Sequence, residues 1–282
     1  MVHQNDWFDI EEVADGWRQI TEGDPVLPCH LLVVEDGDDA VLIDTGLGIA
    51  NLPALIDELV GTAEIPVILT HSHWDHIGAA GQFSDVRIHD RERTDDGRVT
   101  IDVLSDEFGH RPSQFIDNCI EEGLPFPDGF DPDTYAVDPV SNVRSIGAGE
   151  EITVGDRTLE TVPIPGHSPG QLAILDRTAE ICHGADILEP GGEIFAHFED
   201  SDLSTYRESI ARLVDLRDDG AYDTLTIGHG PPITGDDLAI LDAVGNALDQ
   251  IIAGDAAFEA IETSYGPTRE YEIGDLTVLT EQ

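Results

Sequence analysis

Four side chains of the kinds that bind metal ions lie within six residues of this sequence. Residues 71–76 read His-Ser-His-Trp-Asp-His, a His-x-His-x-Asp-His pattern. Neutral imidazole suits zinc, iron and nickel, and a carboxylate adds a harder oxygen ligand. A single tetrahedral ion does not need four ligands on one tight loop, so we expect the ligands to be divided between two adjacent ions. A histidine-rich surface loop without a metal is the alternative interpretation.

Further ligands must come from elsewhere, because one loop cannot surround two ions. Three later residues could supply them, namely His167 in a Gly-His-Ser-Pro-Gly turn, Asp186, and His229 in a Gly-His-Gly segment. An apolar stretch that reads as a strand stands just before each of them. Side chains at strand ends can meet at one edge of a sheet, so we expect these three to converge there.

The elements that must position these residues can be predicted from apolar patterning. Short apolar runs predict strands at 26–34, 40–43, 65–69, 151–154, 158–164, 172–175, 180–183 and 222–227. Helical periodicity predicts helices at 52–60, 204–216 and 236–253. Both halves are rich in strands first and helical afterwards. This order predicts an α+β protein, a sandwich of two mixed sheets with helices on the outer faces.

Residues 87–145 differ from the rest of the chain. They are polar, rich in Asp, Gly, Pro and Arg, and weakly periodic; Phe108, Phe115, Ile116 and Ile120 predict one helix among them. We interpret this stretch as an insertion that forms a lid over the site. A surface elaboration without a catalytic role is the alternative, since long loops can be either. With this insertion, 1–282 is expected to be a single domain.

The charge of the chain limits its partners and its surroundings. Asp and Glu number 59 and Lys and Arg number 13, which gives a net charge of −46, and no Lys occurs. The acidic residues are dispersed, which favours adaptation to molar salt over an acidic surface for a cationic partner. Nucleic acid is a poor partner without a basic patch. Neither a membrane-spanning run nor a secretory signal is visible, so we expect a cytoplasmic protein without a membrane partner.

Taken together, these motifs resemble those of the metallo-β-lactamase-fold hydrolases. The histidine segment, the Gly166–Gly170 turn, the later aspartate and the Gly-His-Gly segment occur in the family order, and Asp44-Thr45-Gly46 matches an early family motif. The resemblance implies an αββα sandwich and two divalent ions per chain, Zn first, with Mn or Fe as alternatives. It also implies the ligands: His71, His73 and His167 for one ion, Asp75, His76 and His229 for the other, and Asp186 as the bridge.

Two adjacent ions indicate a hydrolase. They hold a shared water and lower its pKa, and the resulting metal-bound hydroxide is the expected nucleophile, without a covalent intermediate. Asp75 is placed to orient that hydroxide and to move a proton. Asp44 is a candidate to orient a ligand histidine from behind. Capping of its own turn is the alternative role for Asp44.

The expected substrate is a small molecule with an ester-type bond. A lactone or small carboxylic ester, such as a sugar-acid lactone, is the first choice. A thioester, as in the glyoxalase II type, is the alternative, which the absence of Lys weakens because those relatives hold glutathione with basic residues. A hypothesis from another class is a non-hydrolytic di-iron oxygen-reducing or metal-binding scaffold. Residues that could line the pocket are Trp74, Glu189, His197 and Tyr206, with loop or packing positions as their alternatives. A homodimer stays open.

Overall fold

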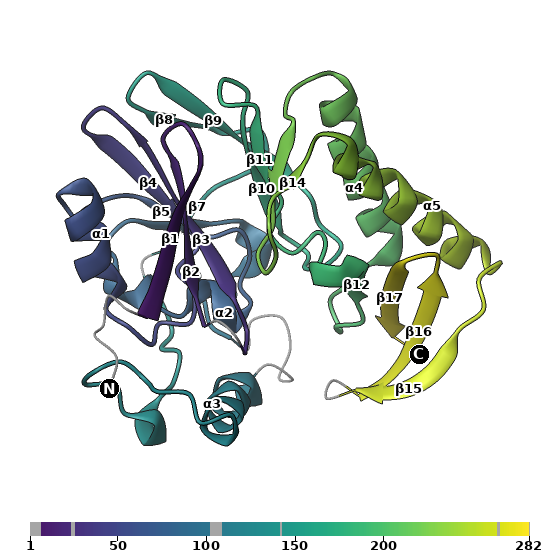
Figure 1. The fold of residues 1–282 in the computed structure, drawn as a ribbon, viewed down its shortest axis with the longest axis horizontal. Coiled ribbons are helices and arrows are strands. Elements are labelled where there is room, and N and C mark those ends of the chain that lie inside the picture. Colours follow the sequence, from purple (N-terminus) through teal and green to yellow (C-terminus); the bar gives the residue numbers. More distant parts are fainter. Residues whose placement is uncertain (1–6, 24–25, 102–108, 142, 264–265, 282) are drawn as a thin grey trace. The chain divides into compact units, whose positions relative to one another are not determined.

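The computed structural model describes residues 7–23, 26–101, 109–141, 143–263 and 266–281 (Figure 1). The chain divides into two compact units. Unit 1 comprises Met1–Gly147 with Thr153–Arg157, and unit 2 comprises Ala148–Ile152 with Thr158–Gln282. The expectation of a single domain stays a prediction.

A seven-stranded sheet of order β1-β2-β3-β4-β5-β6-β7 forms the centre of unit 1. Its strands are β1 (Phe8–Ala14), β2 (Trp17–Glu22), β3 (Cys29–Asp36), β4 (Asp39–Ile43), β5 (Val67–Ile68), β6 (Val86–Ile88) and β7 (Arg144–Ser145). Strands β1 to β4 pair antiparallel, whereas β4 to β7 pair parallel, so the sheet is mixed. The first six residues of β3 and the last three of β4 are buried, as expected for the apolar centre of such a sheet.

The described part of unit 1 also contains three short helices and several 3₁₀ turns, which lie between its strands in the chain. They are α1 (Leu52–Val60), α2 (Trp74–Ile77) and α3 (Arg111–Glu121), with 3₁₀ turns η2 (Ala80–Gln82), η3 (Asp90–Glu92) and η5 (Pro132–Thr134). Helix α1 begins at a cap in which the side chain of Asn51 accepts a hydrogen bond from the Ala54 amide. It ends at Gly61, whose φ of 82° is the left-handed conformation common after helices.

Residues after Gly147 form two further sheets, most of whose strands belong to unit 2. A six-stranded sheet of order β14-β13-β11-β10-β9-β8 consists of β8 (Glu151–Val154), β9 (Arg157–Pro163), β10 (Leu172–Asp176), β11 (Ile181–His183), β13 (Thr224–Thr226) and β14 (Ile233–Thr234). It is mixed, because β11 and β13 pair parallel, whereas β10 pairs antiparallel with both β9 and β11, and β13 with β14. A four-stranded sheet of order β12-β17-β16-β15 consists of β12 (Glu193–Ala196), β15 (Glu259–Thr263), β16 (Gly266–Ile273) and β17 (Leu276–Glu281).

Two long helices complete unit 2, α4 (Leu203–Asp218) and α5 (Ile240–Ala253), the latter preceded by the 3₁₀ turn η7 (Gly235–Ala239). Their apolar faces share one buried cluster with both sheets. Ile210 and Leu213 of α4 and Leu241 of α5 belong to it, together with Leu175 of β10 and Val278 of β17. The helices therefore bury their apolar sides against strands, which is the layered packing expected for this class. Among the described residues, none of the helices combines the length and apolar character needed to cross a membrane.

The mixed sheets with helices confirm the α+β class. Strands at 8–14 and 17–22 were not predicted, because β1 is mostly exposed and both strands carry charged residues within them. The four-stranded sheet was also not predicted. The strand expected at 26–34 begins only at Cys29, since the amide of Leu27 is bonded to the Gly23 carbonyl in a turn. Phe108, part of the helix prediction, lies outside the described residues.

Candidate metal centre

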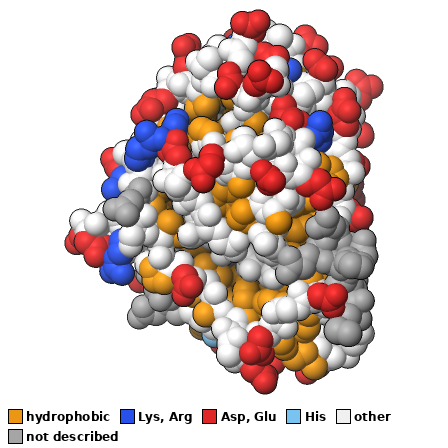
Figure 2. Space-filling view, turned by 90° about the vertical axis from the view of Figure 1, so that its left-hand side faces the viewer, with side chains coloured by type: hydrophobic (Ala, Val, Ile, Leu, Met, Phe, Trp, Pro, Cys, Tyr) orange, Lys and Arg blue, Asp and Glu red, His pale blue; other side chains and the backbone are white. Residues whose placement is uncertain are grey.

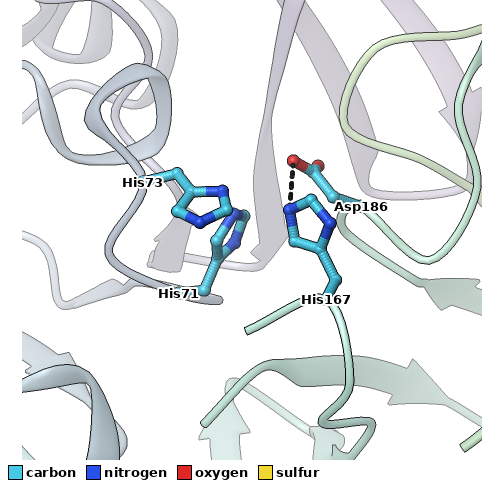
Figure 3. A group of neighbouring side chains, drawn as sticks. All are labelled: His71, His73, His167 and Asp186. Atoms are coloured by element: carbon cyan, nitrogen blue, oxygen red, sulfur yellow. Dashed lines mark ion pairs between the residues drawn. The ribbon is translucent and has the colours of Figure 1, made fainter. Parts of the chain in front are cut away.

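The histidine loop, residues 70–76, follows β5 and includes the first three residues of α2. The loop is buried, with His71 0% and His73 5% exposed. The rings of these two histidines are neighbours, with centroids 4.5 Å apart, and Figure 3 shows both projecting from this loop. The hydroxyls of the alternate residues, Thr70 and Ser72, instead bond to carboxylates. Thr70 and Ser72 therefore anchor the loop, whereas His71 and His73 supply the imidazoles.

Asp44 anchors the loop at both ends. It follows β4, the parallel neighbour of β5, and has a φ of 60°. Its Oδ1 accepts a hydrogen bond from the Thr70 amide (2.7 Å), and its Oδ2 lies 2.9 Å from Nδ1 of His76. When ionised, this carboxylate can only accept, so His76 carries its proton on Nδ1 and offers Nε2 to a metal. These contacts fit the predicted orienting role of Asp44 better than capping of its own turn.

The same carboxylate reaches His71 through a hydroxyl. Oγ1 of Thr70 donates to Oδ2 of Asp44 at 2.8 Å and lies 3.0 Å from Nδ1 of His71. Because the hydrogen of that hydroxyl is used in the bond to Asp44, its oxygen accepts from Nδ1 of His71. The Nε2 atom of His71 is then also the nitrogen left for a metal.

Within the described part of the 87–145 stretch, Glu92 and Phe115 contact the histidine loop. Oε2 of Glu92, which is 0% exposed, accepts from the amide (3.0 Å) and the hydroxyl (2.7 Å) of Ser72. The ring of Phe115 in α3 lies 5.8 Å from the ring of Trp74. A lid function for the stretch stays a prediction.

A second loop, residues 44–50, supports the first. The Thr45 amide donates to the carbonyl of His76 at 2.8 Å. Glu22, 1% exposed, accepts from the amides of Leu47 (2.7 Å) and Ile49 (3.2 Å). Burial raises the pKa of the Glu22 carboxyl, and the hydrogen bonds that it accepts oppose this rise. The hydroxyl of Tyr135, from the 87–145 stretch, donates to the Leu47 carbonyl at 2.5 Å.

Asp75 lies in the first turn of α2 and is 8% exposed. Sγ of Cys29, at the start of β3, lies within 4.8 Å of a carboxylate oxygen of Asp75. Sequence reasoning missed Cys29, Glu22, Glu92 and Tyr135 as neighbours of the site, because none belongs to a local motif. They come from parts of the chain distant in sequence, and only the tertiary fold brings them to the loops.

The candidate ligands of unit 2 lie around Asp186. His167 lies in the turn between β9 and β10, and its Nδ1 is 2.9 Å from the carbonyl oxygen of Phe195. A carbonyl only accepts, so Nδ1 carries the proton and Nε2 is left to bind a metal. Nε2 of His167 lies 3.5 Å from Oδ2 of Asp186, the ion pair drawn in Figure 3. Nε2 of His229 lies 3.4 Å from the same oxygen.

Tyr206 of α4 fixes the segment that carries Asp186. Its side chain is 0% exposed, and its hydroxyl donates to the carbonyls of Asp186 (3.2 Å) and Ile187 (3.0 Å). Burial, followed by the carboxylates of Glu189 and Asp186, raises the pKa of Tyr206 well above its usual value. These contacts favour helix packing over contact with a substrate for Tyr206.

Gly166 lets the His167 turn approach α4. A Cβ at this position would lie 2.3 Å from Cα of Tyr206, and its φ is 139°. We expect Gly166→Ala to lower the free energy of unfolding by more than ~2 kcal/mol, because backbone must move as well as adopt a strained conformation. The measurement is denaturant unfolding. The control is Gly254→Ala, which has a φ of 75° and open space around its Cβ and should cost only about 1 kcal/mol. Equal losses in the two variants would contradict the close-approach explanation.

The other predicted pocket residues are also buried in their own units. Trp74 is 5% exposed, and Glu189 and His197 are each 6% exposed. The ring of His197 lies 4.4 Å from that of Phe198, which in turn lies 5.2 Å from the ring of His167. His197 thus belongs to the surroundings of a candidate ligand. Substrate contact by Trp74, Glu189 and His197 stays a prediction.

The Gly166–Gly170 turn also matches the Gly-x-Ser-x-Gly pattern of serine hydrolases. In those enzymes the serine is exposed on a turn between a strand and a helix. Here Ser168 is 0% exposed, and the element that follows the turn is the strand β10. The turn therefore lacks the setting of a nucleophilic serine.

Known proteins similar to this chain include two hydrolases. Acyl-coenzyme A thioesterase MBLAC2 of Gallus gallus is 27% identical over 238 residues, which cover 79% of this chain and 81% of the relative. Hydroxyacylglutathione hydrolase GloC of Haemophilus influenzae is 28% identical over 203 residues, covering 71% of this chain and 84% of the relative.

Solved structures agree on the fold. A metallo-β-lactamase family protein from Thermus thermophilus superposes with a TM-score of 0.59 at 19% identity, covering 86% of this chain and 82% of that one. The family model described as metallo-β-lactamase superfamily matches residues 24–229, a range that contains all seven candidate ligands. The predicted fold is thereby confirmed, and the chain belongs to the metallo-β-lactamase superfamily of metallo-hydrolases.

Proposed function

We propose that the histidine loop of unit 1 and the Asp186 group of unit 2 together bind two divalent metal ions. The proposed ligands are those that the family resemblance implies, with Asp186 as the bridge and Zn as the first choice of metal. The observation that carries this proposal is the fixed direction of the imidazoles. His76 in unit 1 and His167 in unit 2 each have Nδ1 held by an oxygen, Oδ2 of Asp44 or the Phe195 carbonyl. Such bonds are typical of metal-binding histidines.

We infer further that the substrate is an acyl thioester. The support comes from the two relatives described above, one named as an acyl-coenzyme A thioesterase and the other as a hydroxyacylglutathione hydrolase. Both names describe an acyl group carried on a thiol. We therefore prefer the thioester, which was the alternative substrate expected from the sequence, over the lactone. Because the sequence contains no Lys, we infer that no lysine ammonium group binds the thiol portion of the substrate.

The two ions, when bound, would lower the pKa of a water and polarise the oxygen of the scissile carbonyl. The residues of the chain prepare that site. Asp44 and the Phe195 carbonyl keep His76 and His167 in their metal-binding tautomer. The carboxylate of Asp75 would orient the attacking water and accept its proton. Hydroxide adds to the acyl carbon, the carbon–sulfur bond breaks, and the proton goes to the departing thiolate.

A substrate panel tests the proposed function. Butyryl thioesters of N-acetylcysteamine and of coenzyme A are compared with γ-butyrolactone and ethyl butyrate in molar KCl. We expect kcat/KM for the uncharged N-acetylcysteamine thioester to exceed that for γ-butyrolactone by at least ~10-fold, a difference of about 1.4 kcal/mol in the activation barrier. Faster hydrolysis of the lactone would restore the lactonase hypothesis.

Chelation separates metal-dependent from metal-independent hydrolysis within the same panel. Dialysis against EDTA is expected to abolish thioesterase activity, and Zn²⁺ or Mn²⁺ should restore it. The metal content of the active protein, measured by mass spectrometry, is expected to be about two ions per chain, as in two-metal hydrolases. Full activity after complete removal of metal would overturn the proposed function.

A further inference from the structure

We propose that Glu92 is a positioning residue for metal binding, acting through Ser72. This inference deepens the proposed function and rests on it, because it assumes that the histidine loop binds metal. Ser72 stands between His71 and His73 in the chain. Whatever fixes its backbone therefore fixes the spacing of the two candidate ligands on either side.

The two contacts to Ser72 hold both its backbone and its side chain. The amide donates to Oε2 of Glu92 at 3.0 Å, and the hydroxyl donates to the same oxygen at 2.7 Å. Glu92 is 0% exposed, so water does not compete for these bonds. Hydrogen bonds to a carboxylate in such surroundings are among the stronger ones in proteins.

Glu92 is itself fixed on a neighbouring part of the fold. It ends the 3₁₀ turn η3, which follows β6, and its amide donates to the carbonyl of His89 at 3.0 Å. Strand β6 pairs parallel with β5, the strand that leads into the histidine loop. The carboxylate is therefore held in register with the loop by the sheet, and not by a flexible connection.

Asp44 and Glu92 together hold the loop at alternate residues. Asp44 bonds Thr70, and Glu92 bonds Ser72, while His71 and His73, each the next residue in the chain, have neighbouring rings. Asp44 holds the loop at its ends, Thr70 and His76, and Glu92 adds an anchor between them at Ser72. Removal of a residue that holds a metal ligand in place by hydrogen bonding typically lowers metal affinity by about 10–100-fold.

The contacts suggest variants that remove both bonds, one bond or neither. Both bonds from Ser72 go to one oxygen, so Glu92→Gln can keep both with its amide oxygen, whereas Glu92→Ala loses both. Ser72→Ala loses only the hydroxyl bond. The control is Val99→Ala, which creates a cavity at a residue that is also 0% exposed and lies in the same stretch of unit 1. It distinguishes loss of positioning from general loss of stability.

The readout is the Zn²⁺ dissociation constant, measured by competition with a chromophoric chelator, together with the unfolding midpoint of each metal-free variant. We expect Glu92→Ala to weaken Zn²⁺ binding by about 10–100-fold, Ser72→Ala by less, and Glu92→Gln by no more than about threefold. Val99→Ala should lower the midpoint without changing the affinity.

The outcomes separate this proposal from the proposed function. Wild-type affinity in Glu92→Ala, or an equal loss of affinity in Val99→Ala, overturns the role of Glu92. A wild-type chain that binds Zn²⁺ but hydrolyses no thioester overturns only the substrate assignment, and the affinities still decide on Glu92. A wild-type chain that binds no divalent metal overturns both proposals.

Discussion

Asp186→Asn is expected to lower kcat/KM for thioester hydrolysis by at least ~10³-fold, which corresponds to about 4 kcal/mol of lost transition-state stabilisation. The reason lies in the single oxygen Oδ2, which is 3.5 Å from Nε2 of His167 and 3.4 Å from Nε2 of His229. A carboxylate offers charge and two lone-pair-rich oxygens to two cations, whereas an amide offers one neutral oxygen. The variant should also bind less metal, measured by mass spectrometry of the purified protein.

Asp176→Asn is the matched control for this change. Asp176 is likewise in unit 2 and is 0% exposed, but its Oδ1 accepts from the amides of Thr178 and Ala179 in a turn. The control variant should lose about 1–2 kcal/mol of stability and keep its metal content and kcat/KM. Comparable activity in Asp186→Asn and the wild type would contradict a bridging role for Asp186.

Raising KCl from about 0.1 M to about 2 M is expected to raise the thermal unfolding midpoint by at least ~10 °C, equivalent to several kcal/mol for a chain of this size. The net charge is −46, and Figure 2 shows acidic side chains scattered over one face, with few arginines among them. Repulsion among such charges destabilises the compact state. The Debye length falls from about 10 Å at 0.1 M to about 3 Å at 1 M, so added salt screens this repulsion.

Sucrose provides the control for the salt experiment. It favours burial because it is excluded from protein surfaces, but it does not screen charge. The midpoint should therefore rise much less in sucrose than in KCl. A midpoint that is independent of KCl would refute salt adaptation and favour the alternative, an acidic surface for a cationic partner.

The sequence was sufficient for the features that depend on short stretches of chain. Helix α1 was predicted at its observed bounds, because Pro53 and the apolar spacing of Leu52, Leu55 and Ile56 are local signals. The strand predicted at 26–34 begins and ends too early compared with β3 at Cys29–Asp36, and β1 and β2 were missed. β1 is held by pairing with β2, and β2 by pairing with β3, and such pairing leaves little mark on a short window of sequence.

The candidate ligands could be named from the sequence because metal binding demands particular side chains at particular spacings. The sequence by itself also determined the superfamily, the charge and the absence of Lys. Only the tertiary structure shows which groups hydrogen-bond to the candidate ligands and to the loop that carries them. Glu92 reaches Ser72 across 20 residues, and the Phe195 carbonyl reaches His167 across 28. A buried carboxylate or a backbone oxygen has no motif of its own, since its role depends on which strand lies beside it. The physical reason is that type and spacing are encoded locally, whereas orientation arises from packing.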